Sequence, residues 1–172
     1  GCGLIFVEDT LWVEGVVKGK KSIVAAEVTT PSVTKSIWLP GNITYAMTDG
    51  SDGLMVLGEQ DVLIAINSPD YMTLQGIFIA QNGRFGRNYY TAGGSGQVPP
   101  AYGLYVTRES LTIIGTIVSN LREGTKWTNG QNEFISGYRN RYNSYDRKLA
   151  TNPPPLTPYT SSDYRFVEWR EK

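Results

Sequence analysis

Short stretches of alternating apolar and polar residues run along most of the chain, and several end on a glycine. The pattern apolar, any, apolar, any, glycine occurs as LWVEG at 11–15, IWLPG at 37–41, LMVLG at 54–58, MTLQG at 72–76 and LTIIG at 111–115. Alternation with a period of two is typical of β-strands, whose successive side chains point to opposite faces. Helical periodicity is weak, and 118–126 predicts at most a turn or a short helix. The sequence therefore predicts an all-β protein with an internal repeat.

The spacing of the repeat favours a single-stranded parallel β-solenoid, also called a β-helix. The glycines at 15, 41, 58, 76 and 115 are separated by 26, 17, 18 and 39 residues, so the basic unit has 17 or 18 residues and the longer steps contain insertions. Such a unit cannot bury its own apolar face, but stacked copies share one core, with the glycines at corners. An antiparallel β-sandwich is the alternative, although hairpin signals are sparse. The predicted inward positions are Leu11, Ile37, Leu54, Met72 and Leu111, and Val13, Leu39, Val56, Leu74 and Ile113.

The length of 172 residues suits one domain. We expect a repeat core over 1–120, with a Gly-, Pro- and Tyr-rich loop insertion at 82–110. The remainder, 121–172, is expected to form a C-terminal strap or cap, because NPPPLTP at 152–158 favours an extended segment and repeat folds need capped ends. Within it, YRFVEW at 164–169 predicts a last strand. The start GCGLIFVED lacks a methionine, so we expect a fragment of a longer protein.

Composition narrows the range of functions. Sixteen basic and sixteen acidic residues leave no net charge, so neither nucleic acid nor a membrane surface is an expected partner. Histidine is absent, which excludes Ser-His-Asp and Cys-His catalysis, and the only cysteine, Cys2, cannot form an internal disulfide. We expect no metal, no cofactor and no enzymatic activity. The acidic candidates for polysaccharide cleavage are Glu8, Glu14, Glu59, Asp61 and Asp70, but nothing in the sequence brings them together.

The strongest candidate for ligand binding is the outward position of the repeat. Three residues before each glycine stand Trp12, Trp38, Met55, Thr73 and Thr112. Adjacent strands lie about 4.8 Å apart, so Trp12 and Trp38 are predicted to be neighbours that offer stacking surface to sugar rings. The alternative is that the insertion or the strap covers them, since proteins rarely leave such a patch exposed.

Two further aromatic groups are weaker candidates. The insertion has tyrosines among glycines, a composition typical of binding loops and also of mobile excursions; its aromatics are Phe85, Tyr89, Tyr90, Tyr102 and Tyr105. The C-terminal third combines arginines with tyrosines, which suits stacking on sugars or bases, or ion pairs with Asp146 that hold the strap; these residues are Tyr138, Arg139, Arg141, Tyr142, Tyr145 and Arg147.

The order of several stretches resembles the C-terminal region of PilX-like type IV pilus-associated proteins of Gram-positive-type bacteria. The stretches are LWVEGVVKGKKSIVAAE, IWLPGNITYA, LTIIGTIVSN, GYRNRYNSYDRKLATNPPPLTP and the closing FVEW. The most specific is YDRKLATNPPP, similar to the family's Tyr-Asp-Pro-Arg-Leu run before a proline triplet, although Arg147 here follows Asp146 directly.

The chain also looks similar to the tapirins, surface proteins of cellulose-degrading thermophiles with a cellulose-binding β-helix. Both resemblances imply an extracellular, non-enzymatic cell-surface module. The expected function is adhesion to insoluble polysaccharide such as cellulose through exposed aromatics. The alternative is a structural, minor-pilin-like subunit that binds only pilus proteins.

Overall fold

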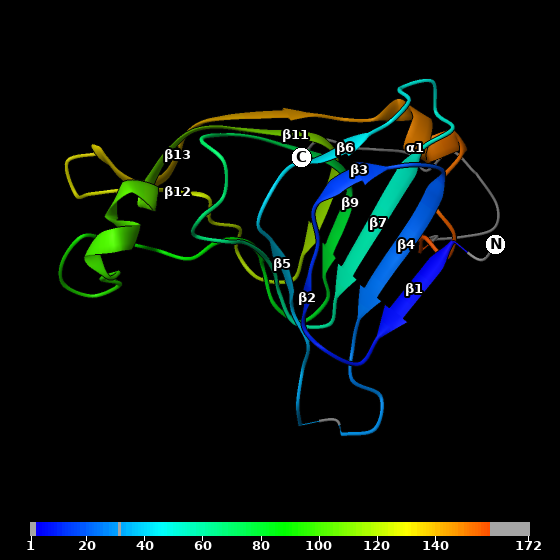
Figure 1. Cartoon of the computed structure of the whole chain (residues 1–172), viewed down its shortest axis with the longest axis horizontal. Coiled ribbons are helices and arrows are strands. Elements are labelled where there is room, and N and C mark those ends of the chain that lie inside the picture. The colour runs from blue at the N-terminus through cyan, green and yellow to red at the C-terminus, as the bar shows by residue number, and fades with distance from the viewer. Residues whose placement is uncertain (1–2, 31, 159–172) are drawn as a thin grey trace, which may run out of the picture.

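Parallel β-strands dominate the computed structural model, which describes residues 3–30 and 32–158 (Figure 1). These residues contain two sheets, one 3-10 helix (Pro100–Tyr105) and one short α-helix, α1 (Arg147–Thr151). The all-β prediction is therefore confirmed. Cys2 and the predicted strand at 164–169 lie outside the described residues.

The strands form three sets of paired neighbours, which we call columns one, two and three. In column one, apolar residues of neighbouring strands lie side by side. Ile5 pairs with Ile23, Ile23 with Val56, and Val56 with Phe78. All of these pairs are parallel, so one line of apolar side chains runs from strand to strand. The column consists of β1 (Leu4–Val7), β4 (Lys20–Ala25), β7 (Gly53–Gly58) and the second halves of β9 (Tyr71–Ala80) and β11 (Thr107–Ser119).

Column two is the smaller sheet, and it is also parallel throughout. Leu11, Ile37, Val62 and Phe85 occupy equivalent positions on its four strands. Because these residues pack into the core, the residue after each of them points outward. The strands are β2 (Leu11–Trp12), β5 (Ile37–Leu39), β8 (Val62–Ile64) and β10 (Phe85–Arg87).

Column three contains the aligned apolar pairs Ile43 with Leu74 and Leu74 with Ile113. Its last strand, β13, carries the only antiparallel neighbour among the described strands, β12. The column consists of β3 (Gly15–Val17), β6 (Ile43–Tyr45), the first halves of β9 and β11, and β13 (Phe134–Ser144), with β12 (Lys126–Thr128) beside it.

The chain visits the three columns in the same order on each pass. Two bends lie inside long strands, at Gly76 and Gly115, which pair with each other and have φ angles of 149° and 143°. Only glycine adopts such angles without strain. Gly76 and Gly115 therefore occupy corners, as predicted for the repeat glycines. At each of them a long strand, β9 or β11, turns from column three into column one.

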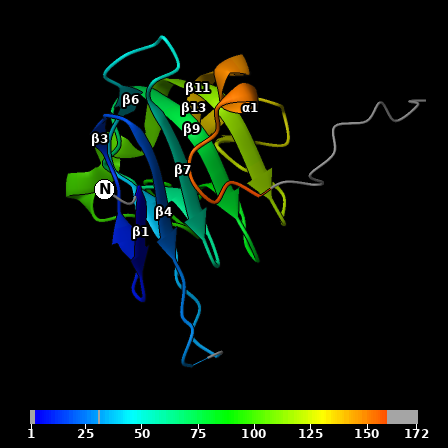
Figure 2. The same ribbon diagram turned by 90° about the vertical axis from the view of Figure 1, so that its right-hand side faces the viewer.

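One apolar core lies between the columns, and a smaller cluster lies on the outer face of column one. The main core contains aliphatic residues from all three columns together with Phe78, Phe85 and Tyr138. In the smaller cluster, Leu149 of α1 packs on Met55, Ile77 and Ile79. The C-terminal segment continues from α1 across this face (Figure 2). There the Ser22 hydroxyl donates to the Pro155 carbonyl.

The predicted repeat alignment is correct for two pairs of copies and wrong for the third copy. Leu11 pairs with Ile37, and Met72 pairs with Leu111. The stretch LMVLG, however, lies in column one, and Val62 takes the place beside Ile37 that the alignment gave to Leu54. The physical reason is that the pattern describes any strand followed by a bend, whichever column it occupies.

The predicted insertion begins later and ends earlier than 82–110. Phe85 is fully buried on β10 and is not a loop residue, while β11 begins at Thr107. The excursion from the columns is therefore 88–106, which projects to one side with β12 and the start of β13 (Figure 1). The C-terminal third also contains a long strand, β13, that the sequence pattern did not predict.

Candidate functional site

Trp12 and Trp38 are neighbours on the outer face of column two. Their strands pair in register, and their ring centroids are 5.6 Å apart with an angle of 18° between the planes. Leu11 and Val13, on either side of Trp12, pack against the core. Alternation therefore turns the indole outward, where 62% of Trp12 is exposed and Trp38 is half-buried.

The two rings form an offset stack, so each covers part of one face of the other. β2 is the edge strand of its sheet, and in the described residues no strand lies beyond it. The far face of Trp12 and the edges of both rings thus remain available. The described part of the C-terminal segment packs on column one, where Leu149 and Pro155 contact it.

Trp12 and Trp38 are neighbours as predicted, but the other three positions of the predicted outward series do not continue their line. The next outward positions of column two are Leu63, which is buried, and Gly86. Met55 is only 1% exposed because α1 covers it. Thr73 and Thr112 do pair with each other, but in column three.

An exposed carboxylate lies close to Trp12 in the sequence, in the turn between β2 and β3. Glu14 is two residues after Trp12, and is exposed. Its side chain reaches toward the next strand, where it occupies the space that a Cβ at Gly41 would need. Glu14 therefore lies across the turn after β2 and the equivalent turn after β5, and its carboxylate can accept hydrogen bonds there.

A second aromatic contact stands at the opposite end of column two. Tyr89 meets Trp127 edge to face, with centroids 5.7 Å apart. Trp127 packs over Gly124, which forms a bridge with Gly86. Sequence reasoning missed Trp127 because it belongs to no copy of the repeat. The available signal was Gly124, three residues earlier, since a glycine leaves room for a large ring to pack over the backbone.

The other loop tyrosines are used to fix the loop. Tyr90 lies under the guanidinium of Arg87 at 4.9 Å, and Tyr105 lies under that of Arg108 at 4.5 Å. Tyr102 packs on Tyr105 and stays 44% exposed. The structure therefore does not bring the predicted loop residues together with Trp12 and Trp38.

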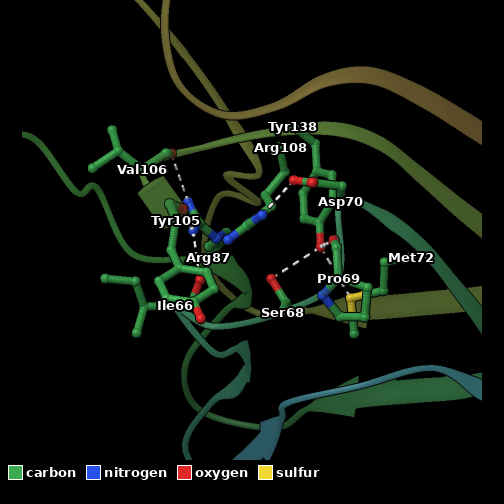
Figure 3. Close-up of polar contacts among 10 residues, drawn as sticks. All are labelled: Ile66, Ser68, Pro69, Asp70, Met72, Arg87, Tyr105, Val106, Arg108 and Tyr138. Atoms are coloured by element: carbon green, nitrogen blue, oxygen red, sulfur yellow. Dashed lines mark hydrogen bonds and ion pairs between the residues drawn. The ribbon is translucent and has the colours of Figure 1, made fainter. Parts of the chain in front are cut away.

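Arg87 and Arg108 anchor the base of the excursion (Figure 3). Arg87 is fully buried and donates to the carbonyl oxygens of Ile66, Tyr105 and Val106. Burial lowers the pKa of its guanidinium to about 10, so it stays charged at neutral pH. Arg108 pairs with Asp70.

Tyr138 completes this cluster from β13. Its hydroxyl donates to the Pro69 carbonyl at 2.9 Å and lies 3.0 Å from the Ser68 hydroxyl. Burial raises the pKa of Tyr138. Tyr138, which was predicted to belong to the C-terminal group of arginines and tyrosines that binds a ligand, is instead a core residue.

The other members of the C-terminal group of arginines and tyrosines are exposed, on β13, on α1 and in the short turn between them. Arg139 lies over the Phe134 ring at 4.6 Å and is 4.0 Å from the Glu109 carboxylate. Asp146 does not pair with the arginines; it caps α1 by accepting from the Lys148 backbone N–H. Tyr142, Tyr145, Arg141 and Arg147 are exposed.

A polar pocket of about 250 Å³ lies between α1 and the turn at 46–52. Its buried carboxylate, Asp52, accepts from the backbone N–H groups of Gly19 and Met47, each at 2.6 Å. Lys148 donates to the Thr48 carbonyl, and burial raises the pKa of Tyr45 to about 12. Because these contacts bind α1 to the turn, the pocket belongs to the packing of the helix.

The predicted acidic candidates are dispersed, and three have structural partners. The Glu59 carboxylate accepts from the backbone of Glu27 and Lys35, that of Asp61 accepts from Arg84, and Asp70 pairs with Arg108. Among residues 3–30 and 32–158, no group of three or more acidic, His or Cys side chains is placed to hold a metal ion. In the same residues, no helix is long and apolar enough to cross a membrane.

No protein-family model matches the chain, and comparisons with curated proteins and with solved structures find no significant match. The resemblance to pilus-associated proteins and tapirins therefore stays a prediction from the sequence.

Proposed function

We propose that this chain is a β-solenoid adhesion module of a bacterial cell-surface protein that binds insoluble polysaccharide, such as cellulose, without enzymatic activity. The observation that carries the proposal is the stack of the exposed Trp12 on the half-buried Trp38, on the outer face of column two. The extracellular location rests on the resemblance to pilus-associated proteins and tapirins.

The strand pairing supports the solenoid. Ten of the eleven strand pairs are parallel, and each of the first four passes of the chain adds one strand to every column. An antiparallel sandwich requires hairpins, and β12–β13 is the one antiparallel pair among the described strands. Stacked coils also explain how residues 26 positions apart, Trp12 and Trp38, become neighbours.

The chemistry of the pair suits sugars. The C–H face of a pyranose ring is apolar and packs on an indole face, while its hydroxyl groups need acceptors such as the Glu14 carboxylate. Each ring contributes on the order of 1 kcal/mol, so one site binds weakly. Adhesion then relies on several copies that engage one surface at once.

Retention on an insoluble glycan tests the proposal. The chain is mixed with crystalline cellulose, xylan and chitin, and the bound fraction is measured over a range of protein concentrations. We expect retention on at least one glycan, a loss of affinity of about fivefold for Trp12→Ala or Trp38→Ala, and a larger loss for the double variant. Tyr102→Ala, which removes an exposed aromatic from the excursion, is the matched control. Retention on none of the glycans, or equal losses for Tyr102→Ala and the tryptophan variants, contradicts the proposal.

The structural subunit is the second candidate function. It is favoured by the edges of β1, β2 and β3, which no strand of the described residues pairs and which can accept strands of another protein. Immunolabelling of filaments on cells separates the two functions, because only a structural subunit is found along the filament when no glycan is present.

A further inference from the structure

The strands that open each column have one free edge. In the described residues, β1, β2 and β3 pair only with β4, β5 and β6. Backbone groups of Gly3 and Val7 bond to β4, since their carbonyls accept from Ser22 and Ala26. In a parallel pair the intervening residues direct their backbone groups to the other side. Within 3–30 and 32–158, the outward N–H and C=O groups of Leu4 and Phe6 therefore have no strand partner and can accept another strand.

The same end of the molecule is apolar and hollow. A pocket of about 240 Å³ opens into the core between the first strands. Ile5 and Phe6 of β1 are 50% and 46% exposed, and Val16 of β3 is 69% exposed. The apolar residues that line the pocket are Ile5, Val13, Val16, Val17, Ile23, Ile43 and Leu54.

The opposite end of the stack is built differently. There the start of β13 is covered by the antiparallel strand β12, with Lys126 opposite Gly137. A second molecule that docked head to tail would meet this hairpin. Two molecules that meet at their open ends bury both open ends at once, which is the closed, two-fold arrangement that most dimers adopt.

Charged residues flank β1 with opposite signs. Glu8 and Asp9 follow its C-terminal end and are exposed. Its N-terminal end lies beside β4, because Leu4 pairs with Ser22, and the turn that leads into β4 carries the exposed Lys18. When two β1 strands run antiparallel, the acidic end of each lies against the lysine turn of the other.

We propose that the open end is a self-association surface on which β1 pairs antiparallel with β1 of a second copy of this chain. Leu4 of each copy lies opposite Phe6 of the other, so that their free backbone groups meet, and Glu8 of each copy faces the turn at Lys18 of the other. The two apolar pockets close over each other. This surface adjoins Trp12, which lies on the edge strand β2, and Glu14, which lines the pocket. The inference does not depend on the polysaccharide proposal.

Sedimentation equilibrium of the 172-residue chain, over a wide concentration range, tests the inference. We expect a monomer–dimer equilibrium. Glu8→Lys and Lys18→Glu alone each raise the dimer Kd by about tenfold, because each places like charges together at two symmetric contacts. The double variant Glu8→Lys with Lys18→Glu restores the Kd to within about threefold of the original value.

A backbone variant tests the strand pairing itself. Phe6→Pro removes an N–H that points to the free edge and leaves the bonds from Gly3 and Val7 to β4 in place, so we expect a folded monomer. Urea unfolding confirms that the variant is folded, and the charge variants decide the question if it is not. A chain that is monomeric at all concentrations, or a dimer that tolerates both the charge reversals and Phe6→Pro, overturns the inference. Glycan retention of the monomeric variants shows separately whether the tryptophan site functions.

Discussion

Replacing Gly115 by alanine is expected to lower the free energy of unfolding by more than about 2 kcal/mol. A Cβ at this position would lie 1.9 Å from the carbonyl oxygen of Gly76 on the paired strand, and the φ angle of 143° is unfavourable for any other residue. The substitution therefore forces β9 and β11 apart at the bend between columns three and one. Urea denaturation followed by tryptophan fluorescence measures the change.

Gly130→Ala is the matched control for this substitution. A Cβ at Gly130 meets no atom within 4 Å, and its φ is not positive, so the change in stability is expected to stay within about 0.5 kcal/mol. Equal stabilities for the Gly115 and Gly130 variants would contradict the register of β9 and β11.

Replacing Arg87 by methionine is expected to cost about 3 kcal/mol of stability. Methionine keeps most of the apolar stem, but removes the donors to the carbonyl oxygens of Ile66 and Tyr105, which are then left without this partner in the interior. Val106 is affected less, since its carbonyl also accepts from the Gly137 N–H. The excursion at 88–106 should also become more sensitive to protease, because its base is released.

Arg84→Met is the control for the buried arginine. Arg84 is half-buried on the same stretch of chain, and its guanidinium bonds only to the Asn88 side chain. Urea midpoints and limited proteolysis of the two variants are compared under the same conditions. A loss for Arg87→Met no larger than that for Arg84→Met would show that the buried hydrogen bonds do not hold the excursion.

The sequence predicted the strands of the core well, because alternation reports directly on which side chains are buried. It also predicted that Trp12 and Trp38 are neighbours, since both precede the glycine of a matching copy of the repeat. It could not predict the fate of Met55, which depends on where α1 packs. An apolar residue at an outward position looks the same in the sequence whether a helix of the same chain or a ligand covers it.

Other features had no usable signal in the sequence. The residues of β13 beyond Tyr138 are exposed on both faces of the strand, and most of them are polar. Its sequence therefore lacks the alternation of apolar and polar residues that marks the other strands. Arg87 is a charge at an inward position, which runs against the rule that cores are apolar. Only the carbonyl groups of distant loops make it tolerable there. Tyr90 and Tyr105 were predicted as ligand contacts because the sequence does not show that arginines cover them.

The indole N–H signals of the four tryptophans, followed by NMR as soluble cello-oligosaccharides or other glycan oligomers are added, test the central claim most directly. The account predicts that the signals of Trp12 and Trp38 shift together with one saturating affinity, while that of Trp127 stays in place. Signals of Trp12 and Trp38 that stay unchanged with an oligomer of a glycan that retains the chain would contradict it.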